Sequence, residues 1–478
     1  MRHIQGTPRD QVQLLPPTID ELIPEEHPVR VIDAFVEACD LKQAGFDKLT
    51  PKATGRPPYH PGDLLKLLIY GYLNQITSSR KLEKACHINL EVIWLLKQLK
   101  PDFKTIASFR AHNSTAIGQI TRQFILFCRQ AGLISGEWIG IDGSKIKAAA
   151  SLNATFTQKQ LDREIEQIER KIDTYLTTLQ TNDDESSDPP EQDQDGTVRK
   201  ALEKLKQRKE TLQQIKQQMH QQQRTHLCAT EPSARLMKST REGIIVGYNA
   251  QHSVDQHCGL IVHHELTDHA NDTRLLQPMV EATSAQLQQL PKVVAADKGY
   301  ANGQQLHALQ RQGIQTAVPP NRAINNRNGG RLFQKADFDY LPDQDAWRCP
   351  AGELLRHRTI NTKARLHLYT TEACGQCRIR HQCTTSPRRW ISRHFDEQAL
   401  ENAANWATQE QMSKRMRLVE PTFAMIKRLL SGTGRFRCWG IEAARSEHAL
   451  AVLGHNLTRA INVLGVKAML MLLPQQMA

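Results

Sequence analysis

The sequence predicts a mixed α/β protein in which a helical N-terminal region precedes a sheet that two insertions interrupt. Three observations predict this class. Apolar residues recur at helical spacing up to about residue 135, and short apolar runs typical of buried strands begin at Trp138. Between these runs lie a heptad pattern and a cysteine-rich segment. A chain of 478 residues, of which 39% are hydrophobic, has enough material for several domains with real cores.

Residues 1–135 are expected to form a helical domain. The run His60-Pro61-Gly62-Asp63 predicts a helix start, because Pro and an acid suit the positive end of a helix. Asp102 or Thr105 is expected to cap the helix that carries Arg110. The pattern alone is equally compatible with a dimerisation or packing module.

Residues 136–156 and 226–321 are expected to form the two parts of the sheet. The expected strands are Trp138 to Ile146, Ile244 to Val254, Leu260 to Leu266, Val293 to Ala296 and Thr316 to Val318, and the expected helices are Arg274 to Gln288 and Gln304 to Gln312. Three strands with short connections, followed by alternating helix and strand, predict a mixed sheet.

The first insertion, residues 157–225, has the heptad spacing of a coiled-coil helical hairpin. Its two apolar stripes are Leu161, Ile165, Ile168, Ile172, Tyr175 and Leu179, and then Leu202, Leu205, Leu212, Ile215 and Met219. Between them lies an acidic loop broken by Pro189 and Pro190, which cannot bury a core. The pattern leaves open whether the helices pair within one chain or between chains, and whether the hairpin is a functional arm or a spacer.

The second insertion, residues 322–395, contains Cys349, Cys374, Cys377 and Cys383 in a segment that looks rich in loops. Four thiolates, two of them separated by two residues, can bind one structural Zn²⁺ in a tetrahedral site. Unligated or redox-active thiols are the alternative. Arginine and histidine residues surround these cysteines and offer a basic face to phosphates: Arg378, Arg380, His381, Arg388, Arg389 and Arg393.

Three carboxylates stand out as candidates for metal-dependent chemistry. Asp142 and Asp297 each follow an apolar run and are expected at strand ends, while Glu420 precedes Pro421, which predicts a helix start or a kink. Such carboxylates can hold two hard cations that clamp the attacking and leaving oxygens of a phosphodiester. Turn, cap or solvated-surface roles are the alternatives, and Glu442 and Glu447 are rival third acids.

Basic residues near these acids fit a polyanionic substrate. Arg415 and Lys427 flank Glu420, and Lys145 follows Asp142, so these three are the candidate phosphate-binding residues. The formal net charge is +12 and the isoelectric point is about 9.2, as expected of a surface that meets nucleic acid. The sequence therefore favours a nuclease or strand-transfer enzyme.

Four motifs together resemble the DDE-class insertion-sequence transposases, in the group whose catalytic domain carries a cysteine-rich insert. They are Ile139-Gly-Ile-Asp142-Gly-Ser-Lys145, Val246-Gly-Tyr248-Asn249-Ala-Gln251, Ala295-Ala-Asp297-Lys-Gly299-Tyr300, and Arg415-x4-Glu420-Pro-x-Phe423-x3-Lys427. The resemblance implies an RNase H-like catalytic domain, with Asp142, Asp297 and Glu420 as the catalytic acids and Mg²⁺ as the metal. It places the third acid in a C-terminal helical part, residues 396–478. Met412 stands where the family usually has Tyr.

We therefore expect a transposase that binds the terminal repeats of its own element, cleaves them and joins them to target DNA. Two Mg²⁺ ions, which Mn²⁺ can replace, and one structural Zn²⁺ are the expected metals, and a homodimer is the expected form in the synaptic complex. An RNase H-like nuclease without strand transfer and a DNA-binding repressor are the alternatives. No apolar run approaches the roughly 20 residues of a membrane span, so a cytoplasmic location is expected.

The helical N-terminal region is expected to recognise the ends of the element as double-stranded DNA. Its basic residues are the candidate contacts: Arg56, Lys66, Arg80, Lys81, Lys84, Lys104 and Arg110.

Overall fold

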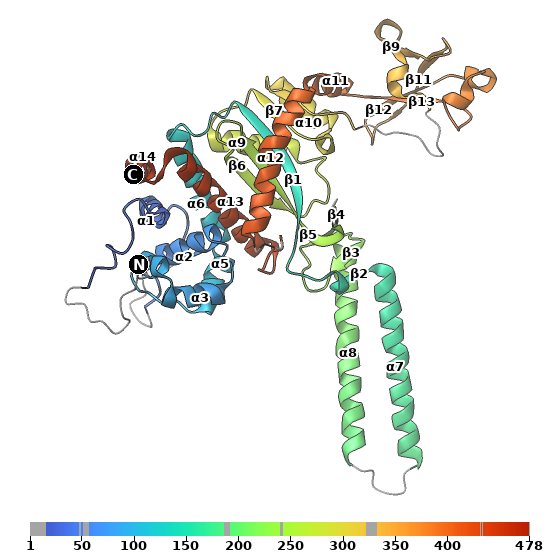
Figure 1. Ribbon diagram of the computed structural model, residues 1–478. Coiled ribbons are helices and arrows are strands. Elements are labelled where there is room, and N and C mark those ends of the chain that lie inside the picture. Colours follow the sequence, from blue (N-terminus) through green and yellow to red (C-terminus); the bar gives the residue numbers. More distant parts are fainter. Residues whose placement is uncertain are drawn as a thin grey trace, which may run out of the picture.

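A helical group lies beside a central sheet, and two insertions project from that sheet (Figure 1). The computed structural model describes residues 16–46, 49–50, 57–185, 192–239, 242–321, 332–430, 432 and 434–477, and it describes no side chains for 178–199. Arg56 and the acidic loop around Pro189 lie outside the described residues, and Leu179 is described by its backbone alone.

The N-terminal region is helical, as predicted. Its helices are α1 Pro28–Ala38, α2 Pro61–Leu73, α3 Ser79–Ile88, α4 Leu90–Leu95, α5 Phe103–His112 and α6 Ser114–Gln130. His60 caps α2 by accepting a hydrogen bond from the Gly62 amide at 3.2 Å. Asp102 caps α5 by accepting one from the Thr105 amide at 2.9 Å, so Asp102 is the cap of the two candidates.

The central sheet contains the predicted strands and is mixed. Its strands are β1 Trp138–Lys147, β4 Arg235–Ser239, β5 Gly243–Asp255, β6 Ile261–Thr267, β7 Val293–Ala295 and β8 Gln315–Ala317. The order is β4-β5-β1-β7-β8, and β6 also pairs with β5. Antiparallel β5 lies on one side of β1 and parallel β7 on the other, with β8 parallel to β7. The connecting helices are α9 Leu276–Leu287 and α10 Gly303–Arg311.

The C-terminal helices join the sheet to the N-terminal helices. They are α11 Glu397–Trp406, α12 Gln409–Leu429, α13 Ile441–Leu464 and α14 Val466–Gln476. One continuous hydrophobic core includes Phe35 of α1, Ile141 of β1 and Leu450 of α13. In the described part of the chain no single helix is long and apolar enough to cross a membrane, although α13 and α14, bent by 112°, meet that test as a pair.

The predicted helix start at Glu420 and Pro421 is wrong. Helix α12 begins well before Glu420, directly after Thr408, whose side chain accepts a hydrogen bond from the Gln411 amide at 3.3 Å. Pro421 lies inside the helix. Burial of Val419 and Phe423 on either side of it supplies the packing that keeps the helix continuous despite the missing amide donor.

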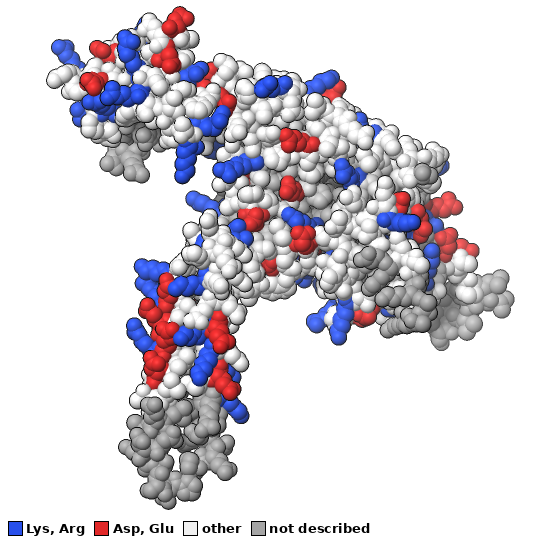
Figure 2. Space-filling view, turned by 180° about the vertical axis from the view of Figure 1, so that it is seen from behind, with Lys and Arg blue, Asp and Glu red and all other residues white. Residues whose placement is uncertain are grey.

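The first insertion is a helical hairpin that packs on itself within one chain, which answers the question left open by the sequence (Figure 1). The hairpin consists of helices α7 Gln158–Glu185 and α8 Gln192–Gln221. The short strands β2 Thr155–Thr157 and β3 His226–Cys228 form its base. Leu161, Ile165 and Leu212 share its buried core. Figure 2 shows both signs of charge along this arm, and three ion pairs link its helices: Asp162–Lys216, Glu164–Arg208 and Glu169–Lys209.

The second insertion contains a five-stranded antiparallel sheet, where a loop-rich segment was expected. Its strands, in the order β13-β12-β11-β10-β9, are β9 Asp339–Leu341, β10 Ala346–Arg348, β11 Leu354–Asn361, β12 Leu366–Thr370 and β13 Trp390–His394. A small core of Phe338, Trp347, Leu355, Tyr369 and Ile391 lies within it. The described residues also form short 3₁₀ turns, which are η1 Leu152–Ala154, η2 Lys298–Tyr300, η3 Lys335–Asp337, η4 Pro342–Gln344, η5 Ala373–Gln376 and η6 Arg380–Gln382.

Candidate functional site

Two of the three predicted acids come together at the centre of the sheet. Gly140 of β1 pairs with Ala295 of parallel β7, and Asp142 and Asp297 each lie two residues farther along. Their side chains therefore meet at the point where β7 ends. Asp297 lies at a strand end, as predicted, but Asp142 lies inside β1, which continues to Lys147. Gly143 pairs with Gln251 of β5, so the chain continues as a strand beyond Asp142.

The surroundings of Asp142 raise the pKa of its carboxyl to about 6. Burial is the main cause, and the nearby carboxylates of Asp297 and Asp272 act in the same direction. Arg415 opposes them, because its Nη2 lies 2.7 Å from Asp142 Oδ2. Three partly buried acids with two cations, Arg415 and Lys145, are short of positive charge, so the group suits the binding of a further cation.

Arg415, which the sequence predicted to bind phosphate, reaches this site from α12. Its guanidinium is buried, pairs with Asp142 and donates from Nε to the Ile141 carbonyl at 3.3 Å. In the structure Arg415 therefore neutralises a candidate acid, whereas a phosphate contact was expected. The other predicted phosphate ligand on this helix, Lys427, is half-buried.

The third predicted acid, Glu420, lies on the same helix but is exposed, next to Val419. Val419 packs against Gly140, where a side chain would come within 2.8 Å of it. The backbone of α12 at Glu420 therefore lies beside β1. Among the described residues, no three His, Cys, Asp or Glu side chains are grouped so as to hold a metal.

The two rival acids are engaged elsewhere. Glu442 pairs with Arg445 at 2.5 Å on the surface of α13. Glu447 is fully buried and accepts hydrogen bonds from the backbone amides of Arg437, at 3.1 Å, and Cys438, at 2.5 Å. It therefore supports the segment before α13, which joins the end of β1 through the Phe436 amide and the Lys147 carbonyl. Met412, in place of the usual Tyr, packs in an apolar cluster with Trp138.

Asp272 is a fourth acid of the site that sequence reasoning missed. Its Oδ1 accepts hydrogen bonds from Asn249 Nδ2 at 2.7 Å and Gln251 Nε2 at 2.8 Å, and Lys145 Nζ lies 3.1 Å away. Lys145, predicted to bind phosphate, thus pairs with this carboxylate. An aspartate shortly before a helix looks like an ordinary helix-start residue, so only the motif Tyr248-Asn249-Ala-Gln251 hinted at this network.

His252 and His448 form a buried pair beside the strand that carries Asp142, and no pattern along the chain indicated this pair. His252 is the β5 partner of Asp142, stacks on Phe423 at 4.1 Å, and shares a hydrogen bond of 2.9 Å with His448 of α13. The Thr422 hydroxyl donates to the Val419 carbonyl, so it accepts its other hydrogen bond from His252 Nδ1. In neutral His252 the Nε2 atom is then the acceptor, and His448 Nε2 is the donor to it. Burial holds the pKa of His448 down to about 3. These neutral rings fix α12 and α13 to the sheet.

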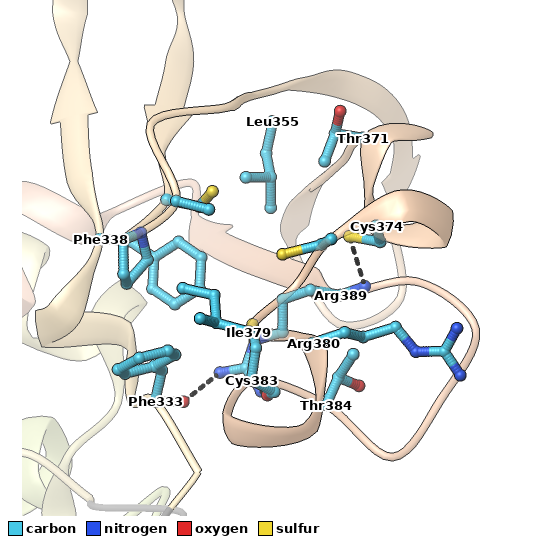
Figure 3. A pocket seen from close by; sticks show the side chains of 14 residues that line it. Phe333, Phe338, Leu355, Thr371, Cys374, Ile379, Arg380, Cys383, Thr384 and Arg389 are labelled. Atoms are coloured by element: carbon cyan, nitrogen blue, oxygen red, sulfur yellow. Dashed lines mark hydrogen bonds between the residues drawn. The ribbon is translucent and has the colours of Figure 1, made fainter.

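The four cysteines of the second insertion line one cavity of about 20 Å³, as Figure 3 shows for Cys374 and Cys383. Phe333, Phe338 and Leu355 form its apolar walls. The Arg389 amide donates to Cys374 Sγ at 3.5 Å, and the guanidinium of Arg389 ties Phe333 to this loop through a hydrogen bond of 2.9 Å. Burial raises the pKa of the Cys383 thiol, and the other three cysteines add to that effect.

Two of the basic residues predicted to contact DNA are internal. Lys66 is buried and pairs with Asp33 at 2.7 Å and with Glu37. Arg110 is buried and donates to the Thr77 carbonyl at 2.7 Å. Apolar neighbours on α2 and α5 place both side chains in the core, where the ion pair or the carbonyl compensates their charge. Four described residues of this predicted set remain at or near the surface: Arg80, Lys81, Lys84 and Lys104.

Two parts of the chain match known protein families. Residues 17–112 match the family described as Transposase domain (DUF772), and residues 348–461 match the family described as Transposase DDE domain. The second match spans Arg415 and Glu420 and ends before the last turn of α13. No curated protein and no solved structure matches the chain.

These two matches support a transposase function. More narrowly, the two matches support an insertion-sequence transposase of the DDE class.

Proposed function

We propose that this protein binds the ends of its own element and catalyses metal-dependent strand cleavage and strand transfer on an RNase H-like catalytic domain. The observation that carries the proposal is that Asp142 of β1 lies beside Asp297, which directly follows the parallel neighbouring strand β7, with Arg415 from α12 against Asp142. The sheet order, with antiparallel β5 and parallel β7 on opposite sides of β1, supports the same fold.

The donor set fits a hard divalent cation, because both side chains offer carboxylate oxygens. Asp142 and Asp297, with Glu420 from α12, would hold Mg²⁺, which when bound stabilises charge on the attacking and leaving oxygens of the phosphodiester. Arg415 favours the charged form of Asp142 through their 2.7 Å contact and so opposes the effect of burial. Exposed Lys298, directly after Asp297, is placed to meet a DNA phosphate.

Joining of DNA ends distinguishes this proposal from its alternatives. The purified full chain should nick DNA that carries the element ends, only with Mg²⁺ or Mn²⁺, and should join the released 3′ ends to a target plasmid. Nicking without joined products would support the nuclease alternative. End binding without nicking would support the repressor alternative.

We further propose that Cys349, Cys374, Cys377 and Cys383 bind one structural Zn²⁺. Thiolates are the donors that structural zinc prefers, and the four cysteines line one small cavity. The hydrogen bond from the Arg389 amide to Cys374 Sγ is the kind of support that such ligands receive. Their sulfurs are not grouped closely enough in this structure to hold the ion, so binding would draw them together. The insert's small core is then stabilised mainly by the metal.

Metal analysis of the purified protein should find about one zinc per chain. Cys374→Ser should lose that zinc and make the insert sensitive to protease while the central sheet stays resistant. The matched control is Cys258→Ser, which changes a lone thiol near the start of β6 and should keep the zinc. Wild-type protein that is fully folded and free of zinc would refute the metal site.

We also propose that α3 carries much of the end recognition. Its outer face holds Arg80, Lys81 and Lys84, while Leu82, Ala85 and Cys86 pack inward. Because the N-terminal helices share a core with the sheet, the test belongs in the full chain.

Replacing Lys81 and Lys84 by Ala should weaken end binding and lower the slope of log affinity against log salt by about 1 for each phosphate that is no longer neutralised. The control removes residues 158–225 and joins Thr157 to His226 by a short glycine loop, since these two residues already pair. That deletion should keep end binding and weaken assembly of the two-ended complex. If the Lys81 and Lys84 variant bound the ends normally and the deletion lost end binding, end recognition would lie on the hairpin.

A further inference from the structure

A chain of buried side chains connects the turn that carries Asp297 to the strands on the far side of Asp142. Tyr300, in the turn after Asp297, is fully buried, and its hydroxyl donates to Gln251 Oε1 of β5. Because β5 and β7 lie on opposite sides of β1, this bond spans the strand that holds Asp142.

The chain continues from Gln251 to an anionic anchor. Gln251 is itself fully buried, and its Nε2 donates to Asp272 Oδ1 at 2.8 Å and to Asn249 Oδ1 at 3.0 Å. Asn249 donates to the same Asp272 oxygen at 2.7 Å, and Lys145 Nζ lies 3.1 Å from it. Both polar groups of the Gln251 amide are therefore used, so its orientation is fixed.

Gly143 makes room for this chain beside the first acid. A Cβ at Gly143 would lie 2.1 Å from Gln251 Nε2 and 2.9 Å from Asp272 Oδ1. The Gly143 amide also donates to Asp142 Oδ1 at 2.8 Å. The same residue thus contacts Asp142 through its backbone and leaves space for the buried amide of Gln251.

The position of Asp297 needs such support because β7 ends at Ala295. The turn that follows is held locally by a hydrogen bond of 2.7 Å from the Gly299 amide to Asp297 Oδ1. We propose that Tyr300, Gln251 and Asp272 form a clamp that sets the position of Asp297 relative to Asp142, and hence the affinity of the pair for a divalent cation. The three are positioning residues, and their role rests on the proposed function.

The test is Mn²⁺ binding to the full chain, measured from the electron paramagnetic resonance signal of the free ion. Tyr300→Phe removes only the hydroxyl and should weaken Mn²⁺ binding roughly tenfold, as loss of a residue that supports metal ligands typically does. The Mg²⁺ concentration for half-maximal cleavage should rise by a similar factor, while end binding stays unchanged. Asp272→Asn, at the far end of the chain, should have the same effect to a smaller degree.

The matched control is Tyr248→Phe. Tyr248 is also a buried tyrosine of this sheet, and its hydroxyl donates to Glu231 Oε1 at 2.6 Å, away from the two acids. The Tyr248→Phe variant should lower the melting temperature about as much as Tyr300→Phe does, and it should leave Mn²⁺ affinity unchanged. Equal Mn²⁺ affinity of wild type, Tyr300→Phe and Asp272→Asn would overturn the clamp alone. Absence of Mn²⁺ binding in wild type would instead overturn the proposed function and the clamp with it.

Discussion

Replacing Asp142 or Asp297 by Asn is expected to lower the rate of end cleavage by ~10³-fold or more, the scale on which loss of a group that stabilises transition-state charge acts. Asn keeps the size of the side chain but loses the charge that a divalent cation needs. End binding should change little, because α3 and its outward-facing cations are untouched. Cleavage of labelled element ends and gel-shift binding to the same DNA measure the two effects.

Glu420→Gln is expected to reduce cleavage on the same scale, on the proposal that this exposed carboxylate completes the site. Glu442→Gln is the matched control, since Glu442 also lies on a helix near the surface but pairs with Arg445. It should cleave like wild type. Glu447→Gln should lower the melting temperature instead, because its carboxylate accepts backbone amides in the core. Wild-type cleavage by Glu420→Gln would remove this residue from the acid triad.

Acidification is expected to destabilise the fold through buried histidines. His252, His448 and His455 are buried, and burial holds the pKa of His448 at about 3, that of His455 at about 4 and that of His252 well below the usual value. A histidine with a depressed folded pKa takes up its proton only on unfolding. Its stabilisation is complete above the unfolded pKa of about 6.5 and is lost as pH falls toward the folded value.

Three such residues should lower the free energy of unfolding by about 5 kcal/mol between pH 6.5 and 5. Asp142 acts in the opposite direction, because its folded pKa of about 6 is raised, and it should offset about 1 kcal/mol of this loss. Urea unfolding at a series of pH values measures the slope. His448→Gln should reduce that slope by about one third. His87→Gln, an exposed histidine on α3, should leave it unchanged, and a flat profile in wild type would contradict the buried neutral pair.

Patterning predicted the central sheet well because its strands are buried runs bounded by turns. Ile244 to Val254 lies inside β5, and the run from Val293 lies on β7, as expected. The five-stranded sheet of the second insertion was not predicted, since its strands are short and β11 is mostly exposed. Its strands therefore lack the apolar runs on which the prediction depended.

The sequence by itself determined the helical N-terminal region, the main strands and the hairpin, because local periodicity depends on neighbours along the chain. The pairing of β1 with β7, which brings Asp142 beside Asp297, was decided by the tertiary structure. Only the tertiary structure decided which charged side chains are exposed and which are buried or paired. It placed Lys66 and Arg110 in the core, turned Arg415 toward Asp142 and brought Asp272 to Gln251. Those outcomes depend on contacts between residues far apart in sequence, and burial there changes both the partner and the pKa of a charged group.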